Sequence, residues 1–381
     1  PDNDFYSEML LWYSTQIKDF ETALIQAKSL DRRKKEDSKR VFEIARLASS
    51  NEYYDVAISA YQFIIDKGPD NYYFLNSKLE IMDVKFLRIT SSAVYMNAEL
   101  VSLEKDYNEV ITELGKTSST ISLLKNLAHL QAFYLDKSAE AMKLLYEALE
   151  ITNAQPKSIA ECKTELADIL LMTGDVWEAT LLYSQVEKAF KDEPIGHTAK
   201  FKNAKLSFYI GEFEWAKAQL DILKAATSKL IANDAMEMSL LISDNIDADS
   251  SYEALAMYSR ADLLVFRNKP DAALVVLDSF PEVFPGHSLM DEVLYKKAEI
   301  YVKKLLYDSA VNCYKDIIEG YSYDILGDNA MFALAKLYEE KYKDKTLAME
   351  YYEKLITTYP GSTYAVEARK KYRALRGDVI N

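Results

Sequence analysis

The feature that most constrains this chain is an alanine that recurs in the same local setting along its whole length. These marker alanines, as we call them, are Ala23, Ala57, Ala141, Ala179, Ala216, Ala273, Ala310 and Ala348. A bulky or aromatic residue generally stands four places later, as Tyr61 follows Ala57, and in most units a second alanine stands twelve or thirteen places earlier, as Ala298 precedes Ala310. Most neighbouring marker alanines are 34 to 38 residues apart. Self-similarity with this period predicts a repeat architecture.

Two antiparallel helices per repeat account for the pattern. Paired small residues let two helix backbones approach closely, and the bulky residues fill the groove beside them. Short polar or glycine-containing phrases such as SSNE and TGD mark the turn between the two helices. A proline, which has no N–H and cannot continue a helix, stands near the end of several second helices, at Pro69, Pro194, Pro285 and Pro360. We expect the next helices to be capped by Asp70 or Asn71, Ser288 and Ser362.

The irregular spacings predict where the array departs from its repeat. The 84 residues between Ala57 and Ala141 leave room for another hairpin, whose second helix would lie within 91–115. The 57 residues between Ala216 and Ala273 leave room for an extra helix near 226–245. We therefore expect an all-α fold: one right-handed α-solenoid of about nine stacked helical hairpins over residues 1–381, ending in a capping helix at 362–376.

The composition argues against several classes of protein. Ten glycines and eight prolines in 381 residues leave little room for the long loops of an enzyme or the turns of a β-sandwich. The formal net charge of −14 argues against a nucleic-acid partner, because such surfaces need clustered Lys and Arg. We expect the one basic cluster, DRRKKEDSKR at 31–40, to be a solvated connection between helices, with a polyanion contact as the alternative. No apolar run approaches the ~18 residues of a membrane-spanning helix, so we expect none.

Patterns that would indicate a metal or a catalytic site are weak. The three histidines, His129, His197 and His287, are isolated in sequence, and we expect His129 to be packed in the core. Cys162 and Cys313 lie 151 residues apart and are expected to be small core residues. The acidic run DNIDADSSYE at 244–253 lacks the glycine and the final glutamate of a calcium loop. We therefore expect no catalysis, no metal and no cofactor.

With these markers and a unit near 34 residues, the chain resembles the tetratricopeptide repeat (TPR) family over nearly its whole length. The resemblance implies a solenoid whose first helices line a concave binding surface. Carrying the family's groove-lining pattern onto each first helix gives the candidate binding residues Phe42, Arg46, Asn126, Phe133, Thr164, Asp168, Phe201, Lys205, Phe208, Tyr258, Asp262, Tyr295, Glu299, Phe332 and Lys336. Such a mixture of rings and polar groups suits a peptide or helix of a partner protein.

Two phrases resemble a narrower group of proteins. YPGSTYAVEARKKY at 359–372 and FPGHSLMDEVLYKKAEIY at 284–301 are similar to bacterial cell-envelope TPR proteins. These are the lipoprotein of the outer-membrane β-barrel assembly machine and the periplasmic coordinator beside the Tol–Pal system. The stretch at 211–245 is also similar to uncharacterised TPR proteins of Bacteroidetes. The resemblance implies a periplasmic or outer-membrane location, partners from an envelope assembly, and room for a lipid anchor at an N-terminus outside this sequence.

We therefore expect a non-enzymatic protein–protein interaction scaffold, and two alternatives stay open. One is a glycan-binding outer-membrane lipoprotein of the SusD type, although its long Trp-rich and Gly-rich loops fit poorly with three Trp and ten Gly. The other is an intracellular TPR regulator whose effector domain has been removed. A lipoprotein signal with no further domain in the full-length gene would favour the scaffold, and an appended DNA-binding or kinase domain would favour the regulator.

Overall fold

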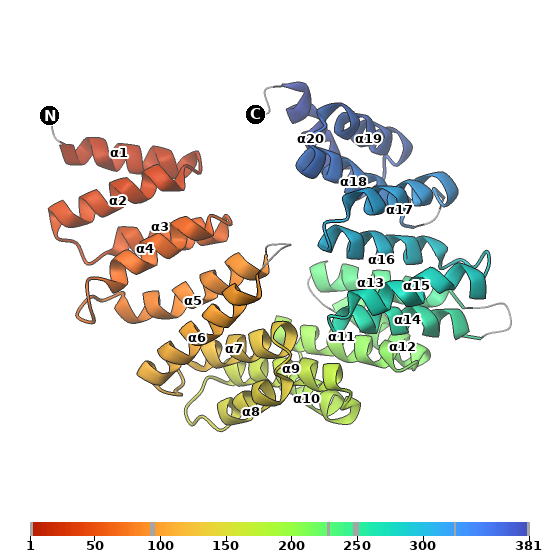
Figure 1. Ribbon diagram of the computed structural model, residues 1–381, viewed down its shortest axis with the longest axis horizontal. Coiled ribbons are helices and arrows are strands. Elements are labelled where there is room, and N and C mark those ends of the chain that lie inside the picture. Colours follow the sequence, from red (N-terminus) through yellow and green to blue (C-terminus); the bar gives the residue numbers. More distant parts are fainter. Residues whose placement is uncertain (1–2, 92–95, 227–228, 247–250, 324, 379–381) are drawn as a thin grey trace. The chain divides into compact units, whose positions relative to one another are not determined.

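The computed structural model describes residues 3–91, 96–226, 229–246, 251–323 and 325–378, and within them the regular structure is helical, without a strand. The predicted all-α fold of stacked helical hairpins is confirmed (Figure 1). The chain divides into two compact units, Pro1–Leu182 and Tyr183–Asn381. One continuous solenoid over 1–381 stays a prediction.

The helices of unit 1 are α1 (Asn3–Gln16), α2 (Phe20–Lys34), α3 (Lys39–Ser50), α4 (Tyr54–Ile65), α5 (Phe74–Thr90), α6 (Asn97–Leu114), α7 (Ile121–Tyr134), α8 (Ser138–Leu149) and α9 (Pro156–Thr173). Helix α10 (Val176–Ala189) runs through the unit boundary. The helices of unit 2 are α11 (Pro194–Tyr209), α12 (Phe213–Ala226), α13 (Lys229–Asp244), α14 (Glu253–Phe266), α15 (Pro270–Val283), α16 (Met290–Lys303), α17 (Tyr307–Gly320), α18 (Gly327–Leu337), α19 (Lys345–Thr358) and α20 (Ala365–Arg376). A π-helical turn, η1 (Tyr338–Tyr342), extends α18. None of the described helices combines the length and the hydropathy needed to cross a bilayer.

Consecutive helices pack against each other as hairpins: α1/α2, α3/α4, α5/α6 and α7/α8 in unit 1, and α11/α12, α14/α15, α16/α17 and α18/α19 in unit 2. Every marker alanine is the fourth residue of its helix and is 0% exposed. The earlier alanines of the first helices, such as Ala204 and Ala298, are also 0% exposed. The paired small residues therefore lie where two helices touch, as the repeat pattern predicts.

The turn inside each hairpin has one backbone feature in common. A residue with left-handed backbone stands five positions before each marker alanine, namely Lys18, Glu52, Asp136, Gly174, Gly211, Asn268, Leu305 and Lys343. Only two of these eight are glycine, the one residue type that adopts this conformation without steric cost. The geometry of the turn therefore requires the left-handed conformation, and residues other than glycine are strained there.

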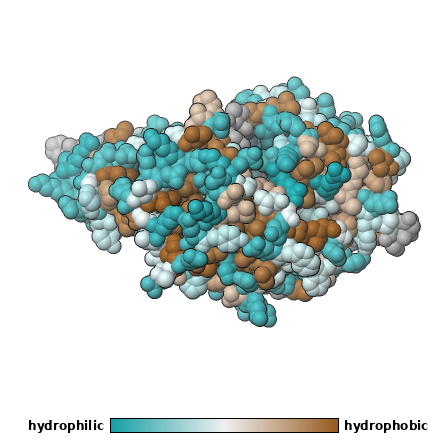
Figure 2. Space-filling view, turned by 60° about the horizontal axis from the view of Figure 1, so that its bottom comes forward, coloured by the Kyte–Doolittle hydropathy of each residue, from teal (hydrophilic) through white to brown (hydrophobic). Residues whose placement is uncertain are grey.

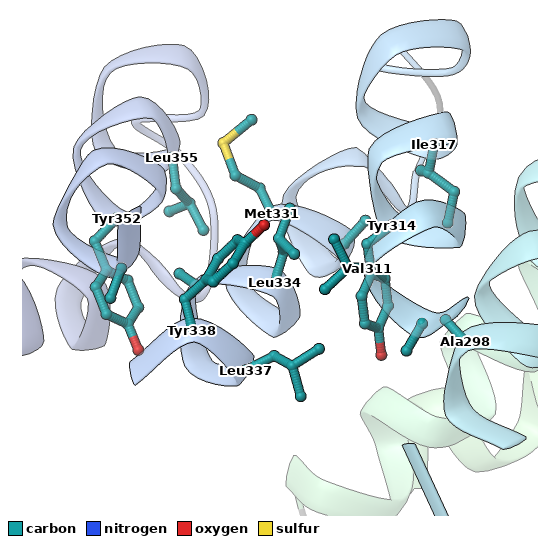
Figure 3. Close-up of a cluster of buried hydrophobic side chains, with 14 of the residues drawn as sticks. Ala298, Val311, Tyr314, Ile317, Met331, Leu334, Leu337, Tyr338, Tyr352 and Leu355 are labelled. Atoms are coloured by element: carbon teal, nitrogen blue, oxygen red, sulfur yellow. The ribbon is translucent and has the colours of Figure 1, made fainter. Parts of the chain in front are cut away.

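The C-terminal hairpins show how the core is built. One cluster of buried apolar side chains extends over α16, α17, α18, α19 and α20. In the close-up, Met331 and Leu334 of α18 lie between Tyr314 of α17 and Tyr352 of α19 (Figure 3). The ring of Tyr352 is 0% exposed, yet its hydroxyl donates to Glu339 Oε2 at 2.7 Å. A tyrosine at this site can thus fill the core and still satisfy its polar end.

The phrase around Pro360 joins one hairpin to the next. Helix α19 ends at Thr358, and the Tyr359 hydroxyl donates to the carbonyl oxygen of Ser322 at 2.7 Å. A Cβ on Gly327 would lie 2.5 Å from the Tyr359 hydroxyl oxygen and 2.9 Å from the same carbonyl. Glycine at the first position of α18 therefore gives Tyr359 room to dock there.

The predicted helix caps are wrong. Helix α20 begins at Ala365 rather than directly after Ser362, whose Oγ accepts instead from the backbone N–H two residues later at 3.1 Å. Asn71 Oδ1 accepts in the same way at 2.9 Å, before α5 begins at Phe74. Ser288 Oγ donates to Asn245 Oδ1 at 2.6 Å. Ser362 and Asn71 stabilise the turn that follows a proline, because their short side chains can bond the nearby backbone there.

The prediction for the basic cluster at 31–40 is also wrong in part. Helix α2 continues to Lys34, so the first half of the cluster is helical. Its cations meet acids of α1: Arg33 Nε lies 2.8 Å from Asp4 Oδ1, and Lys34 Nζ lies 2.6 Å from Glu8 Oε1. Much of the local positive charge is therefore balanced within the chain.

Candidate functional site

A cavity of about 540 Å³ opens on the first helices of unit 2, and we call it the unit-2 groove. Helices α11, α13, α14 and α16 contribute most of its lining, and the start of α18 with the segments before α18 and α20 completes it. The lining residues are Phe201, Lys205, Phe208, Asp234, Glu237, Met238, Leu241, Tyr258, Asp262, Glu292, Tyr295, Lys296, Glu299, Ile325, Leu326, Asn329 and Tyr364. On the face drawn in Figure 2, hydrophilic and apolar residues are interspersed.

Helix α13 forms one wall of the groove because it is inserted between two hairpins. It packs on α12 through a buried stripe that includes Ala235 and Ile242. Ser239 Oγ donates to Asp221 Oδ1 of α12 at 2.7 Å and so fixes the contact. The acids Asp234 and Glu237 lie on the exposed side of α13 and line the groove. Helix α11 still contacts α14, so the insertion adds a wall without separating the first helices.

The centre of the groove is an ion network around Asp262, whose side chain is 12% exposed. Asp262 accepts from the Tyr209 hydroxyl at 3.0 Å and lies 3.5 Å from Lys205 Nζ and 3.2 Å from Lys296 Nζ. Lys296 Nζ also lies 3.0 Å from Glu299 Oε2. Burial disfavours the ionised Asp262, but the two lysines outweigh this and lower the pKa of its carboxyl group below the usual value.

Aromatic rings form the other walls. Tyr258 is buried, and its pKa is raised by that burial. Tyr295 packs edge to face on Tyr314 at a centroid distance of 5.7 Å. Tyr364 stacks on Phe332 at 4.7 Å, with an angle of 18° between the ring planes. These packed rings hold the groove in shape without a ligand.

Glu292, at the start of α16, has an unusual environment. Its Oε1 accepts from Asn245 Nδ2 at 3.2 Å, whereas its Oε2 is shielded from solvent and has no hydrogen-bond partner among the described residues. The adjacent Asp291 is 2% exposed. Burial, and then the interaction with Asp291, raise the pKa of Glu292. A buried, half-satisfied carboxyl group is rare in folded proteins and is a mark of functional sites.

The structure brings together seven of the predicted binding residues. Phe201, Lys205, Phe208, Tyr258, Asp262, Tyr295 and Glu299 all line the unit-2 groove. Phe332 lies behind Tyr364, on which it stacks, and Lys336 is half-exposed with its Nζ 3.9 Å from Glu340 Oε1. The binding role of these residues stays a prediction.

Four of the six predicted residues of unit 1 have side chains that contact other side chains of that unit. Phe42 is 6% exposed and stacks on Tyr73 at 4.7 Å. Arg46 lies over the Phe42 ring and 3.5 Å from Glu80 Oε2. Their contacts are thus made with the adjacent hairpin.

Of the other four, two contact a side chain of unit 1 and two are buried. Asn126 Nδ2 donates to Asp83 Oδ1 at 2.6 Å, and Phe133 stacks on His129 at 4.6 Å. Thr164 and Asp168 are buried rather than presented on an open face. His129, expected in the core, is instead 35% exposed, with its Nδ1 2.7 Å from Glu165 Oε1.

Several groove residues were not predicted from the sequence. Asp234 and Glu237 lie in the inserted helix, where the repeat gives no register. Lys296 directly follows Tyr295, a predicted residue, and its charge next to a groove position was the available signal. Tyr364 follows Pro360 and Ser362, which the sequence places between two hairpins rather than on a first helix.

Other candidate chemistry is not supported by the described residues. His, Cys, Asp and Glu form no group there that could hold a metal ion. Residues 247–250 of the acidic run at 244–253 lie outside the described residues. Cys162 and Cys313 are buried, as predicted, and burial raises the thiol pKa values to about 12 and about 11. Both are therefore protonated near neutral pH and are poor nucleophiles.

Residues 329–362, which span α18 and α19, match the tetratricopeptide repeat family. No curated protein matches the chain. Among solved structures, a TPR protein from Parabacteroides merdae ATCC 43184 is 15% identical, with a TM-score of 0.32 over 79% of this chain and 99% of that one. The P58(IPK) TPR domain is 13% identical, with a TM-score of 0.27 over 98% of both chains. The human IFIT1 dimer with m7Gppp-AAAA is 13% identical, with a TM-score of 0.40 over 96% of this chain and 80% of that one.

Proposed function

We propose that this chain, a TPR repeat protein in its helical hairpins and in its match at 329–362, is a non-enzymatic scaffold that holds a segment of a partner protein in the unit-2 groove. The groove itself carries the proposal, because first helices of successive hairpins and an inserted helix enclose one space of about 540 Å³. Its rings supply contact area for a peptide or helix, and its charges fix register and specificity.

The chemistry of the groove favours binding over catalysis. Both of its lysines already hold Asp262, so neither is available as a free base. Burial raises the pKa values of Tyr258 and Tyr295, which keeps both hydroxyls protonated near neutral pH. Among the described groove residues we find no nucleophile hydrogen-bonded to a base, the arrangement that covalent catalysis requires.

Site-specific photo-crosslinking tests the proposal. A benzophenone amino acid replaces Tyr295 in the groove or, as a control, Tyr72, which is 77% exposed in unit 1. Irradiation of cells that make the full chain is expected to give defined protein adducts from position 295 that are absent from position 72. Identical adducts at both positions, or none from position 295, would remove the groove as the binding surface.

The cell envelope is the location that we propose for this scaffold. The support is the resemblance of the phrases at 284–301 and 359–372 to envelope TPR proteins, and these phrases lie at the α15–α16 and α19–α20 junctions. Partners would then belong to an envelope assembly. Fractionation of cells that express the native gene tests this: we expect the protein with the periplasm or outer membrane, and recovery in the cytosol would refute the location.

A further inference from the structure

We infer that the unit-2 groove receives a basic side chain, lysine or arginine, from the partner segment; this inference rests on the scaffold function proposed above. The groove contains five carboxyl groups and only two lysines, Lys205 and Lys296. Its lining is therefore acidic, and the positions of the unpaired carboxyl groups indicate which ligand side chains it can bind.

The two lysines do not neutralise the whole groove. Lys205 is directed to Asp262, and Lys296 lies between Asp262 and Glu299. Asp234, Glu237 and Glu292 have no Lys or Arg within ion-pair distance among the described residues. These three carboxyl groups lie on α13 and α16, so they face the same space from two helices.

Two of these carboxyl groups already affect each other. Asp234 and Glu237 are three residues apart on α13, which places them on one face of the helix. Partial desolvation, and then the charge of Asp234, raise the pKa of Glu237. A cation placed in the groove would relieve this repulsion, because an opposite charge favours the ionised form of both.

Glu292 faces the same space but adds no charge near neutral pH, because its pKa is raised to about 9. The excess negative charge of the groove therefore comes from Asp234 and Glu237 of α13, which neither lysine reaches.

The aromatic walls suit the same side chain. Phe201, Tyr295 and Tyr364 are partly exposed and line the groove beside the acids. Ring faces attract cations, and a long basic side chain can lay its methylene stem along them. An acidic or phosphorylated segment would instead meet uncompensated like charge, which costs affinity. Rings and carboxylates together therefore select a basic residue.

Peptide selection on the full chain tests the inference. Random 12-residue peptides displayed on phage are selected, and the best binder is labelled with fluorescein for measurement of Kd by fluorescence polarisation. We expect a recurrent Lys or Arg, and replacement of that residue by norleucine should weaken binding at least tenfold. The change is made in the peptide, so folding of the protein does not affect its interpretation.

Matched protein variants locate the contact. The double variant Asp234→Asn/Glu237→Gln, in which both altered residues are exposed, should weaken binding of the same peptide about tenfold. Glu353→Gln removes an exposed carboxylate from α19, outside the groove lining, and should leave Kd unchanged. Equal effects of both variants would mean non-specific attraction to an acidic protein and would overturn the inference.

Two further outcomes separate this inference from the proposed function. Phe201→Ala reports whether a selected peptide occupies the groove at all. Peptides that depend on Phe201 but lack a basic residue, or bind unchanged after norleucine replacement, would refute the basic side chain and leave the scaffold standing. Failure to select any peptide that depends on Phe201 would count against both.

Discussion

Burial should decide how much a carboxylate with two lysines contributes to the stability of this protein, and unit 2 offers a matched pair. Asp262 lies 3.5 Å from Lys205 Nζ and 3.2 Å from Lys296 Nζ, with its side chain 12% exposed. Asp221 lies 2.9 Å from Lys217 Nζ and 2.6 Å from Lys224 Nζ, but its side chain is 38% exposed. The charges are therefore alike and the surroundings differ.

The two Asp→Asn substitutions should differ severalfold in the free energy of unfolding that each one removes. Removing one partner of a buried ion pair typically costs ~3–5 kcal/mol, because the other charge is left without compensation. Lys205 and Lys296 are 37% and 21% exposed, so water recovers part of this, and we expect about 2–3 kcal/mol for Asp262→Asn. Exposed pairs within one helix contribute ~0.3–0.5 kcal/mol each, so Asp221→Asn should cost no more than about 1 kcal/mol.

Hydrogen exchange followed by mass spectrometry measures this difference locally, which suits a repeat protein that need not unfold in one step. Since ~1.4 kcal/mol is a factor of ten, exchange in α14 and α16 should accelerate about 30- to 150-fold in Asp262→Asn. In Asp221→Asn, exchange in α12 and α13 should accelerate less than about tenfold. Comparable acceleration in the two variants, or none in Asp262→Asn, would refute the argument from burial.

Acid provides the control for the same prediction. The folded-state pKa of Asp262 lies below its usual value of 3.8, so its stabilising effect is present above that value and is lost as the pH falls through the lowered pKa. The difference between the wild-type protein and Asp262→Asn should therefore shrink as the pH falls below the usual value of 3.8 and through the lowered pKa of Asp262. A difference that stays constant at acid pH would mean that the substitution acts by a steric effect instead.

Three further predictions follow from single positions. Gly327→Ala should lower the free energy of unfolding by ~1–3 kcal/mol, because the new Cβ would lie 2.5 Å from the Tyr359 hydroxyl oxygen. Its control is Gly320→Ala, whose Cβ would have nothing within 4 Å, so urea denaturation should show an unchanged or higher stability. Lys343→Gly should raise the thermal midpoint, by an amount equivalent to no more than ~1–2 kcal/mol, since Lys343 has φ of 56° in a turn that glycine adopts without strain; a lower midpoint would show that the lysine side chain matters more. Burial and the adjacent carboxyl group raise the pKa of Glu292 to about 9, so the folded chain keeps a proton that the unfolded chain loses above about 4.5. The free energy of unfolding should therefore fall as the pH rises between these two values. The stability of Glu292→Gln relative to wild type should increase from pH 5 to pH 8, and a constant difference in stability would refute the raised pKa.

The helical framework could be predicted because the regular spacing of small residues shows where two helices contact each other. Each marker alanine is the fourth residue of its helix and is fully buried. The caps could not be predicted in the same way, since Ser362 and Asn71 have cap chemistry but use it in the turn after a proline. The hairpin turns were weakly marked because six of their eight left-handed residues are not glycine. Local signals fail where several residue types satisfy the same geometry.

The candidate site was predictable only where the repeat stays regular. Residues at the predicted register of the first helices α11, α14 and α16, such as Phe201, Tyr258 and Tyr295, line one space. The same register in unit 1 identifies the corresponding face of the first helices, but it does not predict which side chains cover that face. Asn126, for example, donates a hydrogen bond to Asp83 of the neighbouring hairpin. Periodicity thus predicts which way a side chain of a first helix points. Whether a groove is open there depends on the side chains of the neighbouring helices.

The inserted helix determines the character of the groove that the repeats build. Without α13 the lining would hold the carboxylates of Asp262 and Glu299 against two lysines, which balance, because Glu292 keeps its proton near neutral pH. Asp234 and Glu237 of α13 add two carboxyl groups that no lysine of the lining pairs with. Because α11 still contacts α14, the insertion adds this charge without breaking the row of first helices. Selectivity for a basic partner is therefore a property of the segment that interrupts the repeat, and a chain that keeps the hairpins but lacks the two acids should keep the groove and lose the preference.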